Sequence, residues 1–268
     1  MNVKEVTGTL LALNGGKKFD KTCDQLIEGS WDYGVTGVVT TFMSTVDVIR
    51  LAINLNCNLI ITHEPTYFTG ADRLEWLKDN EVFRAKKALI GDNKMSIWRY
   101  HDHMHGGNAD LIYTGLLETL GWKKYLNTDL LMPHCYTIPP TTASKLVEFF
   151  KQTLGMRVIQ IVGDPDMKCS RVGILVGGGS LGLGREEMPA ELMNDEKLDV
   201  IVCGEITEWT LTAYVRDAAA LGFNKALIIV GHERSEEPGM KELCNRLRPV
   251  LKGIPVHFID AGEPFIYL

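Results

Sequence analysis

The sequence predicts an α/β protein with mostly parallel sheets. Short apolar runs rich in β-branched residues recur along the chain, and helix-length segments separate most of them. Polar residues follow several of these runs abruptly, as they do where parallel strands end in functional loops. The 268 residues are enough for one large core or two modest ones.

The first half begins with helical spacing over residues 1–13, and a second helix is expected over residues 21–30, which end in Gly-Ser. Strands and helices alternate after that. We expect strands over 35–40, 57–62 and 94–100, and helices over 45–54 and 108–120.

The middle of the chain is marked by PHCYTIPPTT, whose prolines cannot continue a helix or a central strand. Beyond it we expect helices over 143–154, 208–221 and 236–251, and strands over 157–162, 171–176, 198–203, 226–230 and 256–259. No flexible linker marks a boundary. We therefore expect a single unit over 1–268, with approximate halves 1–130 and 131–268.

Composition excludes some classes of partner. The apolar content of 45% and charged content of 23% are ordinary for a globular protein, and the net charge of −6 argues against general nucleic-acid binding. The six cysteines contain no CxxC pair, and the N-terminus has no basic segment followed by a long apolar stretch. No apolar run is long enough to span a membrane. We expect free thiols in a cytoplasmic protein without a membrane partner.

The first candidate ligands are His63 and Glu64, which end the apolar run CNLIIT just before Pro65. Ligands in open α/β sheets bind beyond the carboxyl ends of strands, so this pair is well placed for a metal. A polar pair in a turn or helix cap is the alternative.

The second candidate group lies in the segment HDHMH, which contains His101, His103 and His105. If the preceding strand continues, these three side chains share one face. Imidazole is the commonest ligand for zinc-like metals, and a cation would explain the crowding. An accidental histidine-rich loop is the alternative.

The third group follows the apolar run ALIIV, where His232 and Glu236 stand four residues apart. On a helix this spacing places both side chains on one face, close enough to share an ion. The alternative is a carboxylate that favours a helix N-terminus.

Taken together, the three groups favour a two-metal centre. The proposed ligands are His63, Glu64, His105, His232 and Glu236. Mixed imidazole and carboxylate ligands suit Zn, Mn, Fe or Co, and five ligands exceed the need of one tetrahedral ion.

These motifs resemble the Ngg-one-interacting factor three-like family, whose members are also called dinuclear metal centre or GTP cyclohydrolase type 2-like proteins. The resemblance covers most of the chain and includes VTGVVTTFMSTVDVI, NLIITHEPTYF, HDHMH, VIVCGEITEW and ALIIVGHERSE. It implies a three-layer α/β/α fold with two intertwined, similar domains, whose C-terminal segment returns to the metal cleft. It also implies two divalent metal ions and a homo-oligomer, up to a hexameric ring.

In that family the first motif has two histidines before proline, the second ends in aspartate, and the third is His-x-x-x-Glu. The resemblance therefore assigns His63 and Glu64 to the two-histidine position and His105 to the aspartate position. His232 and Glu236 match without change. Glu64 and His105 depart from the usual residue types, which leaves the metal and any bridging carboxylate open. His101 matches a histidine that the family keeps near its site. We expect it to contact a ligand residue or to face the substrate, although a ligand role stays open, and we expect the same of His103.

Two further motifs follow strands. Residues 177–182 formally fit G-x-G-x-x-G, but glycine and proline delay the helix that a dinucleotide fold needs, so a close-approach loop is favoured. Glu205 is expected to orient a ligand histidine or to act as a base on metal-activated water, or else it belongs to a helix start.

The sequence thus favours a metal-dependent hydrolase that uses metal-activated water on a small-molecule substrate. The family resemblance suggests a nucleotide, although no residue specifies guanine. The alternative is a non-catalytic metal-binding, metal-delivery or scaffold protein.

Overall fold

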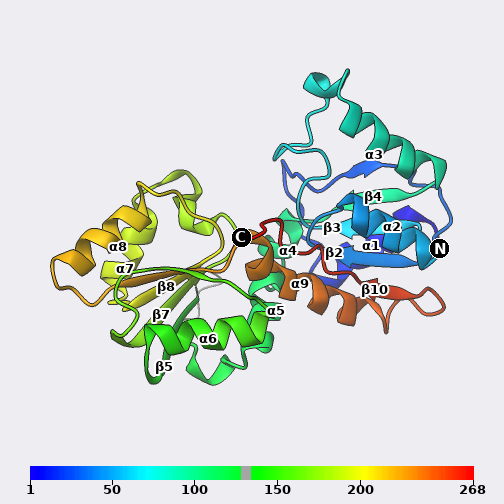
Figure 1. The fold of residues 1–268 in the computed structure, drawn as a ribbon. Coiled ribbons are helices and arrows are strands. Elements are labelled where there is room, and N and C mark those ends of the chain that lie inside the picture. The colour runs from blue at the N-terminus through cyan, green and yellow to red at the C-terminus, as the bar shows by residue number, and fades with distance from the viewer. Residues whose placement is uncertain (128–133) are drawn as a thin grey trace. The chain divides into compact units, whose positions relative to one another are not determined.

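The computed structural model describes residues 1–127 and 134–268, so Pro133 and the expected midpoint at 130 lie outside the described residues. The chain divides into two compact units. Unit 1 comprises Met1–Gly115 and Gly239–Gly262, and unit 2 comprises Leu116–Pro238 and Glu263–Leu268. Each unit contains a five-stranded sheet, which confirms the α/β class (Figure 1).

The sheet of unit 1 has the order β1-β4-β3-β2-β10. Its strands are β1 (Leu26–Glu28), β2 (Val38–Thr41), β3 (Leu59–Thr62), β4 (Ser96–Arg99) and β10 (Val256–Phe258). All neighbours are parallel except β1, which pairs antiparallel with β4. The carboxyl ends of β2, β3 and β4 therefore lie at one edge, where ligand-bearing loops are expected.

Helices cover the sheet of unit 1. They are α1 (Val3–Leu13), α2 (Val46–Asn54), α3 (Glu81–Asp92) and the short α4 (Asp102–Gly106), with the 3-10 turn η1 (Glu75–Leu77) before α3. Residues of α2 and α3 share one buried apolar cluster with Val39, Ile60 and Ile97, so both helices pack on that face. Thr45 and Asn80 cap α2 and α3 by accepting backbone N–H groups. Helices α5 (Leu111–Leu120) and α9 (His232–Leu247) each contain a boundary between the units.

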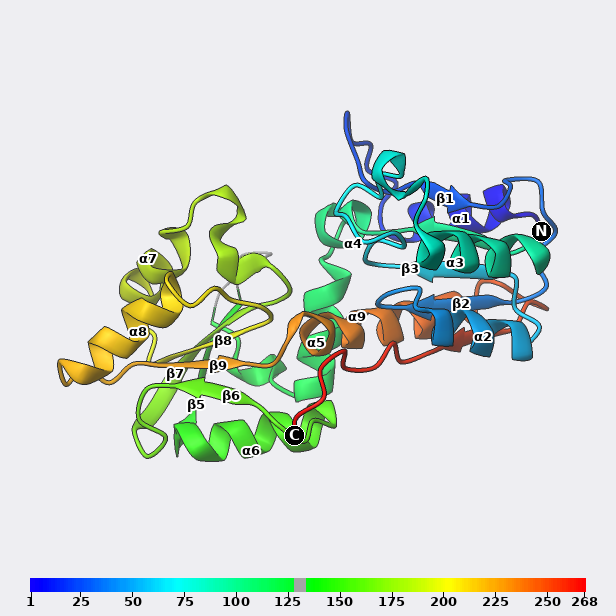
Figure 2. The same ribbon diagram turned by 45° about the horizontal axis from the view of Figure 1, so that its top comes forward.

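The sheet of unit 2 has the order β5-β7-β8-β9-β6. Its strands are β5 (His134–Thr142), β6 (Gln160–Val162), β7 (Lys168–Leu175), β8 (Val200–Cys203) and β9 (Ala226–Ile229). The three central strands are parallel, and β5 and β6 form antiparallel edges. Helix α6 (Ala143–Leu154) lies on one face, and α7 (Met188–Asp195) and α8 (Leu211–Ala220) lie on the other (Figure 2). The 3-10 turns are η2 (Lys123–Tyr125) and η3 (Gly179–Gly184).

The structure differs from the sequence expectations at two places in unit 1. The helix expected over 21–30 is instead a loop followed by β1, because Leu26 and Glu28 pair with β4 and form the edge of the sheet. The strand expected over 94–100 does not continue to His105: residues 102–106 form the helix α4, because strand pairing stops at Tyr100 and Asp24 caps the next backbone N–H groups. The prolines of β5 are accommodated because β5 is an edge strand whose register shifts between Thr137 and Thr141.

No helix among residues 1–127 and 134–268 combines the length and apolar character needed to cross a membrane.

Candidate metal centre

The carboxyl ends of β3 and β4 bring two histidines together in unit 1. The backbone N–H of His63 donates to the carbonyl of Phe42 at 3.1 Å, which extends the ladder beyond β3. The N–H of Tyr100 donates to the carbonyl of Thr62 at 2.8 Å and carries the chain into His101. Since β3 and β4 are parallel neighbours, His63 and His101 leave the sheet at the same edge.

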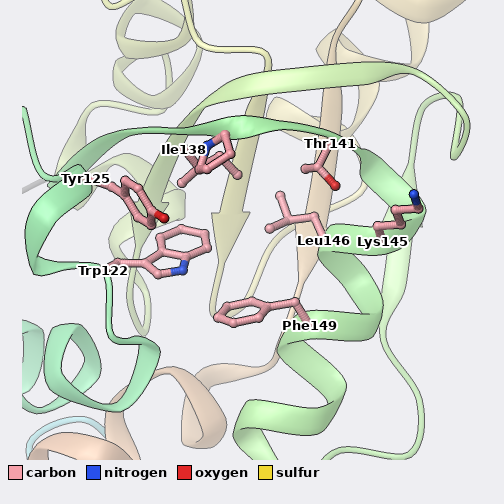
Figure 3. A pocket seen from close by; sticks show the side chains of 8 residues that line it. Trp122, Tyr125, Ile138, Thr141, Lys145, Leu146 and Phe149 are labelled. Atoms are coloured by element: carbon pink, nitrogen blue, oxygen red, sulfur yellow. The ribbon is translucent and has the colours of Figure 1, made fainter.

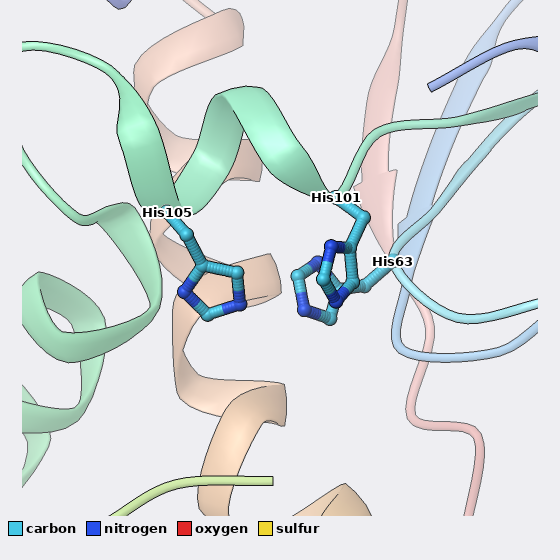
Figure 4. A group of neighbouring side chains, drawn as sticks. All are labelled: His63, His101 and His105. Atoms are coloured by element: carbon cyan, nitrogen blue, oxygen red, sulfur yellow. The ribbon is translucent and has the colours of Figure 1, made fainter. Parts of the chain in front are cut away.

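Helix α4 adds a third imidazole. His101 is its N-cap residue, and His105 lies four residues later on the same helical face. The ring centroid of His63 lies 4.5 Å from that of His101 and 5.1 Å from that of His105. The centroids of His101 and His105 are 5.0 Å apart. Figure 4 shows the three rings converging. One ring nitrogen of each residue lies within 4.8 Å of the others, a spacing that a single ion can bridge. We call these three residues the histidine triad.

The Nδ1 atom of each triad ring faces an oxygen that accepts a hydrogen bond. His63 Nδ1 donates to the Tyr100 carbonyl at 3.2 Å, His101 Nδ1 to Asp102 at 3.0 Å, and His105 Nδ1 to Asp110 at 2.9 Å. A donating Nδ1 places the lone pair on Nε2, which is the form that binds a metal. Carboxylates behind two of the rings also increase their basicity as ligands. The donor set therefore fits a borderline divalent metal ion.

Burial, together with the neighbouring rings of His63 and His105, lowers the pKa of His101 to about 4. His101 is therefore neutral at neutral pH. A neutral imidazole can bind a metal without first losing a proton.

The start of α4 depends on a carboxylate that sequence reasoning missed. Asp24 accepts the backbone N–H groups of His101 and Asp102 at 2.7 Å and that of His103 at 3.1 Å. These are the N–H groups that a helix leaves unsatisfied at its N-terminus, so Asp24 acts as a cap supplied by a distant segment. Next to it, the N–H of Cys23 donates to Asp102 at 2.9 Å.

Asp102 is held as a carboxylate by its surroundings. Burial raises its pKa, but hydrogen bonds from the Cys23 backbone, His101 and Thr22 outweigh this, so the pKa lies well below its usual value. Asp102 therefore stays ionised and available as the acceptor for His101. The only sequence signal for this role was its place between two histidines.

His103 points away from the triad. Its Nδ1 lies 2.6 Å from Asp24 and its Nε2 lies 3.0 Å from the Lys17 carbonyl. Both nitrogens thus contact oxygen acceptors within the fold. The structure places His103 in the packing of α4 against residues 17–24 rather than beside the triad.

Glu64 lies between the triad and a buried arginine. One carboxylate oxygen is 3.7 Å from His101 Nε2, and the other is 3.4 Å from the Arg99 guanidinium. Arg99 is only 3% exposed and also donates to the carbonyl oxygens of His63 and Gly70. Glu64 therefore lies beside the Nε2 atom of His101, and its charge is balanced by Arg99 on the other side.

The loop after Glu64 is fixed by a buried lysine and an aspartate. Lys86, on α3, donates to the Thr66 carbonyl at 2.7 Å, and Asp72 accepts the backbone N–H of Tyr67 at 2.5 Å. Burial lowers the pKa of Lys86 to about 8, and the charge of Asp72 partly opposes this shift. These contacts hold the loop that carries His63 and Glu64.

Three further predicted site residues belong to unit 2. His232 begins α9, and its Nε2 lies 3.2 Å from Glu236, while its Nδ1 lies 3.4 Å from Glu205. The two carboxylates therefore approach opposite ring nitrogens of His232. The expectation that one centre contains both this group and the triad stays a prediction.

The glycine-rich loop lies against this group. A Cβ atom on Gly177 would come 2.0 Å from Glu236 Oε1 and 2.8 Å from His232 Nε2, and its φ is +53°. The next element, η3, is interrupted by non-helical backbone at Gly182, and α7 begins only at Met188. The loop therefore makes a close approach to the histidine and carboxylate and does not open directly into a long helix.

Comparison with known proteins identifies the family. Residues 1–264 match the family model described as Duf34/NIF3 (NGG1p interacting factor 3). The chain belongs to the NIF3 family. This confirms the resemblance inferred from the sequence motifs.

The relatives of this NIF3 chain are distant in sequence and similar in fold. Proteins of Clostridium acetobutylicum and Clostridium perfringens, each named GTP cyclohydrolase 1 type 2 homolog, are both 23% identical. The matches cover 84% and 91% of this chain and 81% and 90% of the relatives. A solved Bacillus cereus protein related to NIF3 has a TM-score of 0.79 at 14% identity, over 100% of this chain and 99% of that one. A Staphylococcus aureus protein has a TM-score of 0.73 at 21% identity, over the same shares. At these identities the structures show a shared fold.

Proposed function

We propose that this NIF3 protein is a divalent-metal-dependent hydrolase whose histidine triad holds a metal ion. The observation that carries this proposal is the set of three converging imidazoles, each with Nδ1 bonded to an oxygen acceptor. A polar cluster that served only packing would not need three rings in one tautomer. Zn, Mn, Fe or Co fits such a donor set.

The proposed ligand set differs from the one expected from the family resemblance. We assign His101 as a ligand beside His63 and His105, because its ring stacks on His63 with 20° between the planes and its Nδ1 is held by Asp102. Glu64 is assigned to the charge pair with Arg99 and to the rim of the site. His232 and Glu236 are candidate ligands for a second ion, with Glu205 orienting the ring of His232.

A divalent ion would lower the pKa of water toward neutrality and polarise the bond under attack. The side chains of this chain supply the remaining steps. Asp102 and Asp110 keep the triad rings oriented, and Glu64 Oε1 is placed to accept a proton beside the triad. Arg99 keeps the second Glu64 oxygen in an ion pair, which orients the accepting oxygen.

The proposed substrate is a small molecule of the nucleotide type. This part rests on the name shared by the Clostridium relatives, GTP cyclohydrolase 1 type 2 homolog. No described side chain around the triad singles out guanine. The substrate screen in the test below therefore has to identify the bond that is cleaved.

The test begins with metal content. Protein loaded separately with Zn, Mn, Fe or Co is dialysed, its bound metal is measured by mass spectrometry, and hydrolysis of nucleotides, phosphoesters and cyclic amides is then assayed. We expect bound metal and activity in the wild type, and loss of the triad metal in His101→Gln. His257→Gln, which changes a histidine on β10, is the matched control and should keep both.

The metal content tests the ligand assignment, and the hydrolysis assay tests the proposed activity. Metal retained in His101→Gln at wild-type stoichiometry would refute the ligand assignment. Metal bound without hydrolysis of any compound in the panel would refute the hydrolase and favour a metal-binding or delivery protein.

A further inference from the structure

Unit 2 contains a pocket of about 230 Å3 between η2, β5 and α6 (Figure 3). Its walls are mainly apolar and include Trp122, Tyr125, Ile138, Leu146 and Phe149. The rings of Trp122 and Phe149 stack with centroids 5.3 Å apart and 13° between their planes. Aromatic walls of this kind present flat apolar surface to a ligand.

Three polar groups line the same pocket. They belong to the lining residues Tyr125, Thr141 and Lys145. Within the described part of the chain, no hydrogen bond engages either hydroxyl and no carboxylate pairs with Lys145. An apolar pocket with a few convergent polar groups is the usual form of a small-molecule site.

The charge of the pocket is positive. Lys145 is the charged residue among its lining side chains, and the Lys124 ammonium lies 4.9 Å from the centre of the Tyr125 ring. The N-terminus of α6 contributes little to the binding of an anion, because its first backbone N–H groups already have acceptors. Those of Ala143 and Ser144 donate to the carbonyl oxygens of Met167 and Pro165, and that of Lys145 donates to the Thr142 hydroxyl. Binding of an anion would therefore depend on the lysine side chain.

The pocket is separate from the His232 group of the same unit. Thr141 pairs with Cys169 near the start of β7, whereas Gly177 and Glu205 follow the other ends of β7 and β8. Leu175 lies six positions after Cys169 along β7, which corresponds to about 20 Å at roughly 3.3 Å per residue. A ligand here would not occupy the candidate metal ligands.

We propose that this pocket binds a small molecule with a planar aromatic ring and an anionic group. The ring lies against Trp122 and Tyr125, and the anionic group meets Lys145 and the Thr141 hydroxyl. A nucleoside monophosphate and an aromatic carboxylate share this chemistry. The proposal does not depend on hydrolysis at the metal centre.

The indole N–H resonances of the full-length protein test the proposal. The chain has five tryptophans, and Trp122→Phe assigns the signal of Trp122. Adenosine monophosphate and indoleacetate are titrated separately, with neutral indole as the control for charge. We expect the Trp122 signal to shift and saturate with at least one anion, and the preferred anion distinguishes a phosphate from a carboxylate.

Two substitutions locate the binding. Lys145→Gln should weaken the anion about fivefold, as expected for one exposed charge pair, and leave neutral indole unchanged. Lys151→Gln, on the same helix but outside the pocket, is the matched control. No shift of Trp122 with either anion, or equal weakening by both substitutions, would overturn the proposal. A Trp122 signal that changes with protein concentration alone would overturn it in favour of a second copy of the chain covering the pocket.

Discussion

The substitution Asp24→Asn is expected to weaken both the start of α4 and metal binding by the histidine triad. Asp24 accepts three backbone N–H groups, at 2.7, 2.7 and 3.1 Å, and contacts the His103 ring nitrogen at 2.6 Å. Asparagine has one acceptor oxygen, and its amide nitrogen would face donors on the other side. The bonds to one of the two oxygens are therefore lost.

The magnitude follows from these contacts. One Asp24 oxygen accepts from the backbone and ring of His103, and a hydrogen bond to a charged group contributes about 1.5–3 kcal/mol. Partial reorganisation reduces the sum, so the free energy of unfolding should fall by about 2–4 kcal/mol. Because α4 carries His101 and His105, zinc affinity should fall by about tenfold, the lower end for groups that orient ligands.

The assay uses metal-free protein for urea unfolding and a chromophoric chelator as competitor for zinc. Zinc affinity is measured where circular dichroism shows the variant to be folded, so that unfolding does not contribute. Asp20→Asn, at an exposed position of the same segment, is the matched control. Unchanged zinc affinity in a destabilised Asp24→Asn protein would refute the link between the cap and the triad. Unchanged unfolding would refute the hydrogen-bond argument itself.

Other contacts give three further predictions. Asp110→Ala removes the acceptor for His105 Nδ1 and should lower zinc affinity by about 10- to 100-fold in the same competition assay, and unchanged affinity would contradict the role of Asp110. Gly177→Ala should lower the free energy of unfolding by about 1–3 kcal/mol because of its positive φ and the 2.0 Å approach to Glu236. Gly178→Ala, whose Cβ would have its nearest contact at 3.5 Å, should cost less, and equal effects would count against the close approach. Metal-free protein should lose about 3 kcal/mol of stability as the pH falls from about 6.5 to about 4, because unfolded His101 takes up a proton before folded His101 does. His101→Gln should flatten the pH profile of urea unfolding in that window, and an unchanged slope would show that another group is responsible.

Hydrophobic periodicity was enough to predict the strand ends that carry the site. The apolar run that becomes β3 stops at Thr62, and the run that becomes β4 stops at Arg99, so His63 and His101 could be placed at one sheet edge. His232 and Glu236, which are four residues apart, also lie on one helix in the structure, because His232 begins α9. These features depend on local pattern and on the general geometry of parallel sheets.

Other parts of the site depend on contacts between distant segments. Asp24 stands 77 residues before His101, and nothing in its local sequence indicates that it caps another helix. The same contact favours a helix over residues 102–106. The local sequence does not predict this helix, because Met104 is the one large apolar residue of the segment and a single residue shows no periodicity. The helical interpretation of residues 21–30 failed for a related reason, because pairing with β4 overrides local spacing.

The carboxylate at position 64 has a charge partner in Arg99. The Arg99 guanidinium is buried and donates to the carbonyl oxygens of His63 and Gly70, but neither carbonyl neutralises its charge. Glu64 supplies the opposite charge at 3.4 Å. Removing one partner of a buried pair leaves an uncompensated charge, which costs about 3–5 kcal/mol. A histidine at position 64, which the family resemblance leads one to expect, would therefore require a neutral residue at position 99. The identity of residue 64 is thus expected to be coupled to that of residue 99, and the three imidazoles of the triad remain the ligands that we propose.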